Sequence, residues 1–407
     1  MSDHTIEAAR ESDWDAIFRV VREAFLHEHS DDMSAVERAV VEIDRTLVAR
    51  RDGEVAGTAT IQTRHLAVPG GLVPAAHITG VAVAPTARRQ GILTGFMRRM
   101  FDSALAAGEP VAVLWASEGR IYQRFGYGLA CASLAFTINR ADVSLTVSAS
   151  GGRLREAEPT TLRDDLVALY GRVYAGRPGW SERTPRHWDY RLADLKEWRH
   201  GGAEMRAVAH YDESGTIDAY ALWRPLRRWS DGGPASEVRV IEHVAANPQA
   251  YLALWAYLWS IDLTKTVHIH FAAVDEPLVH AVSDPERLNA RVGDGLWVRV
   301  LDVPAAFAAR RYATDIDLVL EVTDAAIAAN AGRWRLTGSP TGATCVATGD
   351  EPDLTCDVRA LGAVYLGGTA LATLAGTGQV IEHTPGALAR ADAALRWYPG
   401  PSSQEVF

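Results

Sequence analysis

Residues 77–127 carry the clearest alternation of hydrophobic and polar positions in the chain. Apolar side chains alternate over residues 78–83, which predicts a strand that ends before Pro85. After a short basic turn, apolar side chains return at helical spacing, at Ile92, Leu93, Phe96, Met97, Met100 and Leu105. The apolar run 111–116 predicts a further strand. The pattern therefore indicates a strand, a turn, a helix and a second strand.

The basic turn, residues 88–91, stands where the helix begins. The first amides of a helix have no carbonyl partner inside it, and the positive end of the helix dipole lies behind them, so an anion is stabilised there. Gly91 lets the backbone come close to a ligand, and Arg88 and Arg89 add positive charge. A pyrophosphate would fit this site, although such a turn can equally be a solvated loop.

The remaining periodicity divides the chain into three units. The first opens with a strand at 5–9, a helix with one apolar face from Trp14 to Phe25, strands at 47–51, 54–62 and 65–69, and a later strand at 130–139, before a small polar linker at 148–152. The second has strands at 205–210, 219–224 and 237–243, a helix at 250–258 and a strand at 267–272. A third unit begins near Arg299, with a helix after Pro304 and strands at 316–322 and 333–337.

The second unit repeats the order of the first without its basic turn. At the matching position stand Ala245, Ala246, Asn247 and Pro248, which supply neither a glycine nor a cation. This unit is predicted to have lost the phosphate site and to support the first.

Charge and cysteine content narrow the functional classes. The net charge of −10 argues against sequence-independent nucleic-acid binding, which needs a basic face. No apolar run approaches the length of a membrane span and no signal peptide pattern is present, so we expect a cytoplasmic protein that does not enter membranes. Cys131, Cys345 and Cys356 show no metal-ligand spacing, so we expect buried thiols and no metal.

Two segments resemble one known family. The string V-x-V-x-P-x-x-R-R-x-G-I, from Val81 to Ile92, resembles motif A of the acyl-CoA-dependent GNAT superfamily, with Leu93 departing from the usual small residue. The segment SEGRIYQRFGYG, residues 117–128, and the wider chain are similar to the Eis-type (enhanced intracellular survival) acetyltransferases. The resemblance covers nearly the whole chain.

The resemblance implies an α+β fold of three domains. It places a catalytic GNAT domain at residues 1–150, a degenerate GNAT-like domain at 151–298, and a sterol-carrier-protein-like α/β domain at 299–407. It also implies that the C-terminal tail enters the cleft of the first domain.

The same resemblance implies a site for acetyl-CoA as co-substrate. Its expected residues are Val81, Ala82, Val83, Arg88, Arg89, Gln90, Gly91, Ile92, Leu93, Thr94, Ser117 and Glu118. The backbone groups of Val81 and Val83 are expected to pair with the pantetheine arm, while residues 88–93 cradle the pyrophosphate.

The catalytic groups are expected at Tyr127 and Phe407. A tyrosine, with a pKa near 10, can protonate a leaving thiolate while it stays neutral at pH 7. The resemblance implies that Tyr127 is this general acid and that the terminal carboxylate of Phe407 is the general base. His27, Glu28, Gly80 and Glu405 are weaker candidates for the acceptor side of the site.

The leading hypothesis is thus an acetyl-CoA-dependent N-acetyltransferase acting on primary amines. By resemblance, the cationic acceptor is an aminoglycoside or a lysine side chain, and the assembly is a homohexamer, a trimer of dimers. A non-catalytic regulatory protein that binds acyl-CoA or a lipid is the alternative. The basic turn and the tyrosine favour the enzyme.

Overall fold

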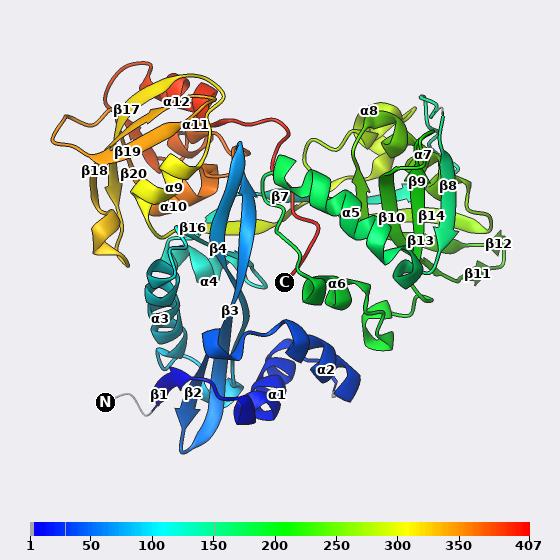
Figure 1. Ribbon diagram of the computed structural model, residues 1–407, viewed down its shortest axis with the longest axis horizontal. Coiled ribbons are helices and arrows are strands. Elements are labelled where there is room, and N and C mark those ends of the chain that lie inside the picture. Colours follow the sequence, from blue (N-terminus) through cyan, green and yellow to red (C-terminus); the bar gives the residue numbers. More distant parts are fainter. Residues whose placement is uncertain (1–3, 29, 150) are drawn as a thin grey trace.

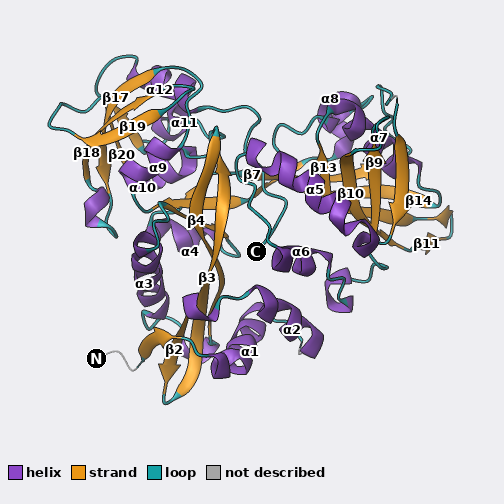
Figure 2. Ribbon diagram, in the orientation of Figure 1, coloured by secondary structure: helices purple, strands orange, loops and turns teal. Residues whose placement is uncertain are grey.

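The computed structural model describes residues 4–28, 30–149 and 151–407, which form three large sheets and one two-stranded ribbon (Figure 1). The expected linker at 148–152 therefore lies partly outside the described residues. Each sheet is flanked by helices, as Figure 2 shows, so the chain has the predicted α+β architecture.

The first sheet has seven strands in the order β1-β2-β3-β4-β5-β16-β6. Its strands are β1 (Thr5–Ala8), β2 (Thr46–Arg51), β3 (Glu54–Val68), β4 (Gly71–Val83), β5 (Val111–Trp115), β6 (Gly128–Leu129) and β16 (Leu296–Val300). The helices of this part are α1 (Trp14–Phe25), α2 (Asp31–Val40), α3 (Ile92–Ala106) and α4 (Gly119–Tyr122). Only β4 and β5 pair in parallel, because α3 connects them.

The long hairpin of β3 and β4 differs from the prediction. Two strands were expected, at 54–62 and 65–69, but they form the single strand β3, and β4 begins seven residues before the expected Ile78. The polar pair Thr63 and Arg64 interrupts the apolar pattern without interrupting the strand. Arg64 is buried at the contact with the second sheet, so its polarity reflects an interdomain contact rather than a turn.

The second sheet also has seven strands, in the order β15-β7-β14-β13-β10-β9-β8. Its strands are β7 (Ala132–Asn139), β8 (Arg153–Ala157), β9 (Arg206–Tyr211), β10 (Ile217–Leu226), β13 (Ser236–Ala245), β14 (Thr264–Ala272) and β15 (Arg291–Asp294). A small ribbon, β11 (Trp229–Ser230) and β12 (Gly233–Pro234), and helices α5 (Arg163–Val173), α6 (Pro185–Leu192), α7 (Pro248–Ser260) and α8 (Leu278–Ala281) complete this part. Again one parallel pair, β13 and β14, is joined by a helix, α7.

The first two sheets exchange strands. β7 precedes the second domain in sequence but pairs with β14, and β16 follows that domain but lies between β5 and β6. The expected domain ranges 1–150 and 151–298 are continuous in sequence, whereas each of the two sheets contains one strand that begins in the other range. Hydrophobic periodicity predicts that β7 is a strand but carries no information on its partner.

The third sheet has five strands in the order β19-β18-β17-β20-β21. They are β17 (Ile316–Thr323), β18 (Gly332–Gly338), β19 (Ala343–Ala347), β20 (Leu354–Asp357) and β21 (Val380–Glu382), with helices α9 (Val303–Ala309), α10 (Val358–Val364), α11 (Leu371–Ala375) and α12 (Ala387–Leu395). Buried residues of this unit, such as Phe307 and Leu361, share one hydrophobic core with Val111 and Val298 of the first sheet. The two units are therefore packed as one body.

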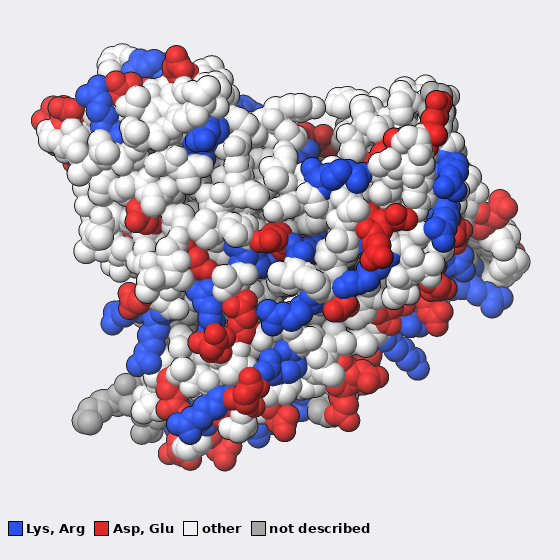
Figure 3. Space-filling model, in the orientation of Figure 1, with Lys and Arg blue, Asp and Glu red and all other residues white. Residues whose placement is uncertain are grey.

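After α12 the chain crosses to the middle of the molecule. Figure 1 shows the C-terminus between the β3–β4 hairpin and α6. Figure 3 shows acidic and basic side chains intermingled on this face, with no continuous basic area. None of the helices among the described residues is long and apolar enough to span a membrane.

Candidate active site

The first sheet opens between β4 and β5. The two strands pair at Ala75, Ala76 and His77, opposite residues 111–113, but no pairing continues to Val83. The register of β4 against β3 shifts near Gly80, whose φ of 59° is left-handed and suits glycine. The bulge turns the end of β4 away from β5, which leaves backbone groups of β4 without a strand neighbour on that side.

Helix α3 begins at this opening without a side-chain cap. Its N-cap is Gly91, with φ of 86°, and Arg89 is also left-handed, with φ of 63°. No side chain of the cap accepts from the first turn, so the amides of Ile92, Leu93 and Thr94 point outward unpaired within the helix. A side chain at position 91 would meet nothing within 4 Å, which shows that the space in front of these amides is open.

A cavity of about 650 Å³ lies in front of the helix start. Every residue predicted to bind the cofactor lines it except Gln90, whose side chain donates to the carbonyl of Thr86 at 3.4 Å. Six further residues line it and were not predicted: Ala24, Phe25, Ala87, Ile121, Tyr122 and Arg124. Phe25 follows the apolar stripe of α1, so its periodicity suggested core packing, yet it is 41% exposed at the cavity.

The charges of this cavity favour an anion. Arg88, Arg89 and Arg124 line it, and the one carboxylate among its described lining residues, Glu118, pairs with Arg120 at 3.0 Å. Arg88 donates only to the carbonyl of Val83, at 3.3 Å, so its other N–H groups are free to bind. Three cations and an uncapped helix start together form a site that suits a diphosphate.

The two tyrosines after β5 occupy different environments. Tyr122, at the end of α4, lines the cavity, and burial raises its pKa to about 12, with a contribution from nearby Glu118. Tyr127 is fully buried, and its ring packs against Phe101 and Tyr122 at centroid distances of 6.1 and 5.8 Å. Tyr127 does not line the cavity. Tyr122 therefore lines the cavity, and the expected acid Tyr127 lies behind it, in contact with its ring.

The reason for this difference lies in the local backbone. α4 is four residues long and is followed by a tight turn, Gln123–Phe125, and by Gly126 with φ of 85°. Across this turn the direction of successive side chains follows neither the period of a helix nor that of a strand. Position in the motif therefore could not tell which ring faces the cavity.

Phe407 ends the tail beside the point where β4 and β5 part. Its ring packs edge-on against His77, with a centroid distance of 4.7 Å, and the Arg64 guanidinium lies 6.0 Å from the ring centroid. His77 is fully buried, and burial lowers its pKa to about 3. In this neutral state Nδ1 donates to the carbonyl of Ala75 and Nε2 accepts from the Ser181 hydroxyl, at 3.0 and 2.8 Å.

Glu405 fixes the tail between the two sheets. Its carboxylate accepts from Arg64 at 2.6 Å and from Arg183 at 2.7 Å. Burial acts to raise the pKa of Glu405, but these two guanidinium groups outweigh it and hold the pKa well below its usual range. Both carboxylate oxygens are thus paired with arginines in this structure, while the weak prediction that Glu405 binds the acceptor stays a prediction.

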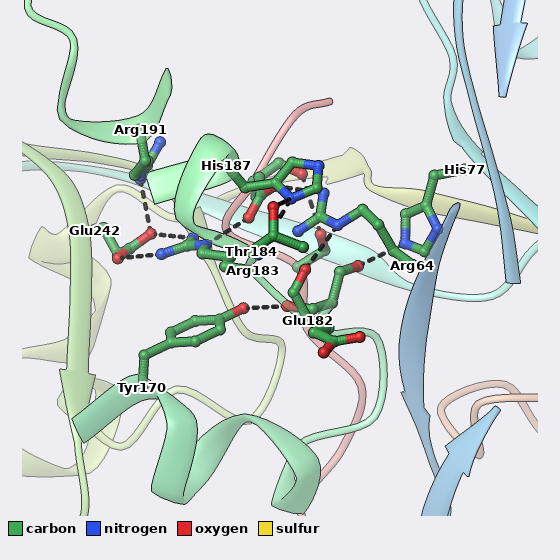
Figure 4. Close-up of polar contacts among 12 residues, drawn as sticks. Arg64, His77, Tyr170, Glu182, Arg183, Thr184, His187, Arg191 and Glu242 are labelled. Atoms are coloured by element: carbon green, nitrogen blue, oxygen red, sulfur yellow. Dashed lines mark hydrogen bonds and ion pairs between the residues drawn. The ribbon is translucent and has the colours of Figure 1, made fainter. Parts of the chain in front are cut away.

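Arg183 links this contact to the second sheet. It also donates to Glu242 of β13, at 3.0 and 2.6 Å, and both side chains are at most 2% exposed (Figure 4). Gln404 adds a second tie, because its amide exchanges two hydrogen bonds of 3.0 Å with the backbone of His243. The tail is thus held by both domains.

The other weak candidates lie elsewhere. His27 and Glu28 follow the end of α1, are exposed and do not line the cavity. Gly80 contributes the bulge of β4 and no side chain. Among the described residues no group of three or more His, Cys, Asp or Glu side chains is placed to hold a metal. The three cysteines are buried thiols, as predicted.

The second sheet lacks an equivalent anion site. The side chain of Asn247 caps α7 by accepting from the amide of Ala250 at 2.9 Å, and Pro248 removes a further amide. The helix start is therefore already satisfied, in agreement with the predicted loss of the phosphate cradle.

Comparison with known families defines the class of protein. Residues 5–130 and 179–300 each match a family model described as acetyltransferase (GNAT) domain, and residues 303–402 match sterol carrier protein domain. The protein is thus a GNAT acetyltransferase with a duplicated catalytic fold and a C-terminal sterol-carrier-like domain.

Full-length relatives identify the branch of this family. An uncharacterized N-acetyltransferase of Streptomyces avermitilis is 40% identical over 395 residues, and the N-acetyltransferase Eis of Mycobacterium bovis is 34% identical over 407, each alignment covering 96% of both chains. The crystal structure of Eis1 from Mycobacterium abscessus superposes with a TM-score of 0.85 at 31% identity, covering 99% of this chain and 100% of that one. The chain belongs to the Eis-type N-acetyltransferases, which confirms the predicted family, fold and enzyme class.

Proposed function

We propose that this enzyme transfers the acetyl group of acetyl-CoA to a primary amine by direct attack on the thioester. GNAT acetyltransferases use acetyl-CoA as co-substrate. The observation that carries the proposal is a single cavity that joins the uncapped start of α3, Arg88 and Arg89 to the side chain of Tyr122. A cofactor whose diphosphate binds the helix start would have its thioester arm between the separated ends of β4 and β5.

Tyr122 is proposed as the general acid because its side chain lines the cavity, and the predicted acid Tyr127, whose ring it contacts, is the alternative. The amine nitrogen attacks the thioester carbonyl carbon, the carbon–sulfur bond breaks, and the thiolate takes the proton of the Tyr122 hydroxyl. Because the pKa of Tyr122 is about 12, this hydroxyl is protonated throughout the physiological range. The raised pKa makes the Tyr122 hydroxyl a weaker acid but keeps it protonated, which is the form that can donate.

The terminal carboxylate of Phe407 is assigned as the base. The acceptor ammonium first loses one proton to solvent and attacks as the neutral amine. The carboxylate would then take the second proton from the nitrogen, directly or through a water, and return it to the tyrosinate through solvent. This assignment is supported by the location of Phe407 next to the point where β4 and β5 separate. Phe407 packs on His77, the last residue of β4 that pairs with β5, and Glu405 and Gln404 anchor the preceding backbone.

Family resemblance extends the proposal to the acceptor, the assembly and the compartment. It favours an aminoglycoside or a lysine side chain as the source of the amine, a trimer of dimers, and a cytoplasmic enzyme. Sedimentation would test the hexamer independently of catalysis.

Extension of the C-terminus tests the proposal. The enzyme is assayed for thiol release from acetyl-CoA with a panel of primary amines, as the native chain and with glycine and serine appended after Phe407. The extension should lower kcat by about 100-fold or more, while the KM for acetyl-CoA changes by less than about twofold. The same residues added before Met1 serve as the control.

Normal turnover by the extended chain would exclude the carboxylate from catalysis. An absence of thiol release from the native chain with every amine would overturn the proposed transfer itself.

A further inference from the structure

A second cavity, of about 510 Å³, lies between the tail and the second sheet. Its walls come from α6 and the turn Lys196–Arg199, from β10, β13 and β14, and from Gln404 and Val406 of the tail. It occupies the face of the sheet opposite α7, toward the first domain. We call it the arginine cavity.

The arginine cavity is lined by basic, aromatic and aliphatic side chains. Its arginine and histidine members are Arg191, Arg199, Arg224, Arg239, His200 and His270. Among the described residues no aspartate or glutamate lines it. The carboxylates that balance these arginines, Asp194, Glu204, Glu237 and Glu242, lie outside the lining. The cavity therefore presents guanidinium donors to its interior and keeps the acidic partners outside the lining.

Two of the four arginines retain unused donors. The closest partners of Arg239 are the carbonyl of His200 at 3.3 Å and Glu237 at 3.4 Å, both long for a charge-assisted bond. Glu237 is held more tightly by Arg228, at 2.9 Å. Among the described residues, Arg191 is engaged only through Nη2, which pairs with Glu242 at 2.9 Å and donates to the carbonyl of Ile241 at 3.1 Å. Its Nη1 group therefore remains available to an anionic ligand.

The arginine cavity adjoins the proposed reaction site. Val406 lines it, and the next residue, Phe407, carries the carboxylate assigned as base. Phe271 lines it as well and packs on Trp115, with ring centroids 5.0 Å apart. Trp115 ends β5, and the residues that follow, Ser117 and Glu118, line the acetyl-CoA cavity. A ligand in the arginine cavity therefore lies on the acceptor side.

We infer that the acceptor is a primary amine that also carries an anionic group, a carboxylate or a phosphate, which Arg239 and Arg191 bind. This inference rests on the proposed acetyl transfer and narrows its substrate class. Among the primary amines proposed above, an acceptor that carries an anion should bind more tightly than a matched acceptor without one, because the anion meets guanidinium donors. A zwitterionic amine fits, since its anion meets the arginines while its amine extends toward the tail.

Matched acceptor pairs test the inference. Glucosamine is compared with glucosamine 6-phosphate, and cadaverine with L-lysine, which has the same amine chain plus a carboxylate. The anionic member of at least one pair should have a kcat/KM about tenfold or more higher, since one charge-assisted contact supplies that factor. The two pairs distinguish phosphate from carboxylate.

Arg239→Gln should remove most of this preference by raising KM for the anionic member alone. Arg228→Gln is the matched control, because Arg228 pairs with the same Glu237, is 59% exposed at its side chain and does not line the cavity. Circular dichroism melts of both variants establish that they fold.

Calorimetric titration of glucosamine 6-phosphate and L-lysine into enzyme saturated with CoA separates this inference from the proposed function. Binding that Arg239→Gln weakens at least about tenfold supports the anion site even if no acetyl transfer occurs. Equal or better turnover of cadaverine, glucosamine and neomycin, or an equal loss for both members of each pair in Arg239→Gln, would overturn the inference.

Discussion

At the scale of single residues, the motif located the site but not the orientation of its side chains. The string around Arg88 predicted the part of the cavity wall formed by the end of β4 and the start of α3, because a strand followed by a helix fixes where the helix amides point. The tyrosines were different. Tyr122 and Tyr127 lie five residues apart across a four-residue helix, a tight turn and a left-handed glycine, so no period relates their directions. Only the folded backbone distinguishes the cavity ring from the core ring.

Substitution of each tyrosine by phenylalanine tests this distinction. Tyr122→Phe should lower kcat by about 100-fold or more, with little change in acetyl-CoA binding, because it removes the proposed acid. Tyr127→Phe should retain activity and unfold at an equal or higher temperature. Its hydroxyl is buried without a hydrogen-bond partner, so its removal costs nothing.

Steady-state kinetics and thermal melts of the two variants give the answer. A large loss of kcat in Tyr127→Phe with Tyr122→Phe active would restore the original assignment.

At the scale of elements, two helices in matching positions show what makes an anion site. α3 begins at Gly91 with no cap, whereas α7 begins with Asn247 and Pro248, which satisfy or remove its first amides. The sequence predicted this contrast correctly, because caps are local and depend on residue type. It did not predict the bulge at Gly80, which depends on pairing with β3.

Neutralisation of the basic turn should weaken acetyl-CoA binding specifically. The double variant Arg88→Gln, Arg89→Gln is expected to raise KM for acetyl-CoA about tenfold or more and to leave kcat within about twofold. The effect should shrink in high salt, because both side chains are exposed. Arg98→Gln, on the exposed face of the same helix, is the control. A fall in kcat at unchanged KM would contradict a binding role.

At the scale of the whole molecule, buried charges join the two sheets through the tail. Glu242 lies between Arg183 and Arg191, and Arg183 reaches Glu405. The sequence spacing of these residues does not indicate that they are in contact, because they come from α6 and the loop before it, from β13 and from the last residues of the chain. For the same reason the sequence could not show that β16 completes the first sheet. Contacts over such separations depend on the topology and not on local pattern.

This network predicts acid sensitivity. Burial acts to raise the pKa of Glu242, but Arg183 and Arg191 bring it to about 2, below the ordinary 4.5. Between these values the unfolded state binds more protons than the folded state, so this contribution to stability is complete above pH 4.5 and is lost as pH falls toward 2. Thermal midpoints measured from pH 3 to pH 7 should show the decline.

Glu242→Gln should cost about 3 to 5 kcal/mol at pH 7, because it removes the carboxylate partner of Arg191 and leaves Arg183 paired only with Glu405, and it should flatten the loss of stability at low pH. Glu204→Gln removes a surface partner of Arg199, 74% exposed at its side chain, and should change stability by less than about 1 kcal/mol. Equal effects of the two substitutions would show that the buried network contributes no special stability.

The exchange of β7 and β16 determines when the catalytic sheet can be finished during synthesis. Folding of nascent chains proceeds from the N-terminus, yet the first sheet waits for residues 296–300, which emerge only after the whole second domain. A chain released before residue 296 lacks β16, so it cannot complete the sheet whose opening holds the cavity at the start of α3.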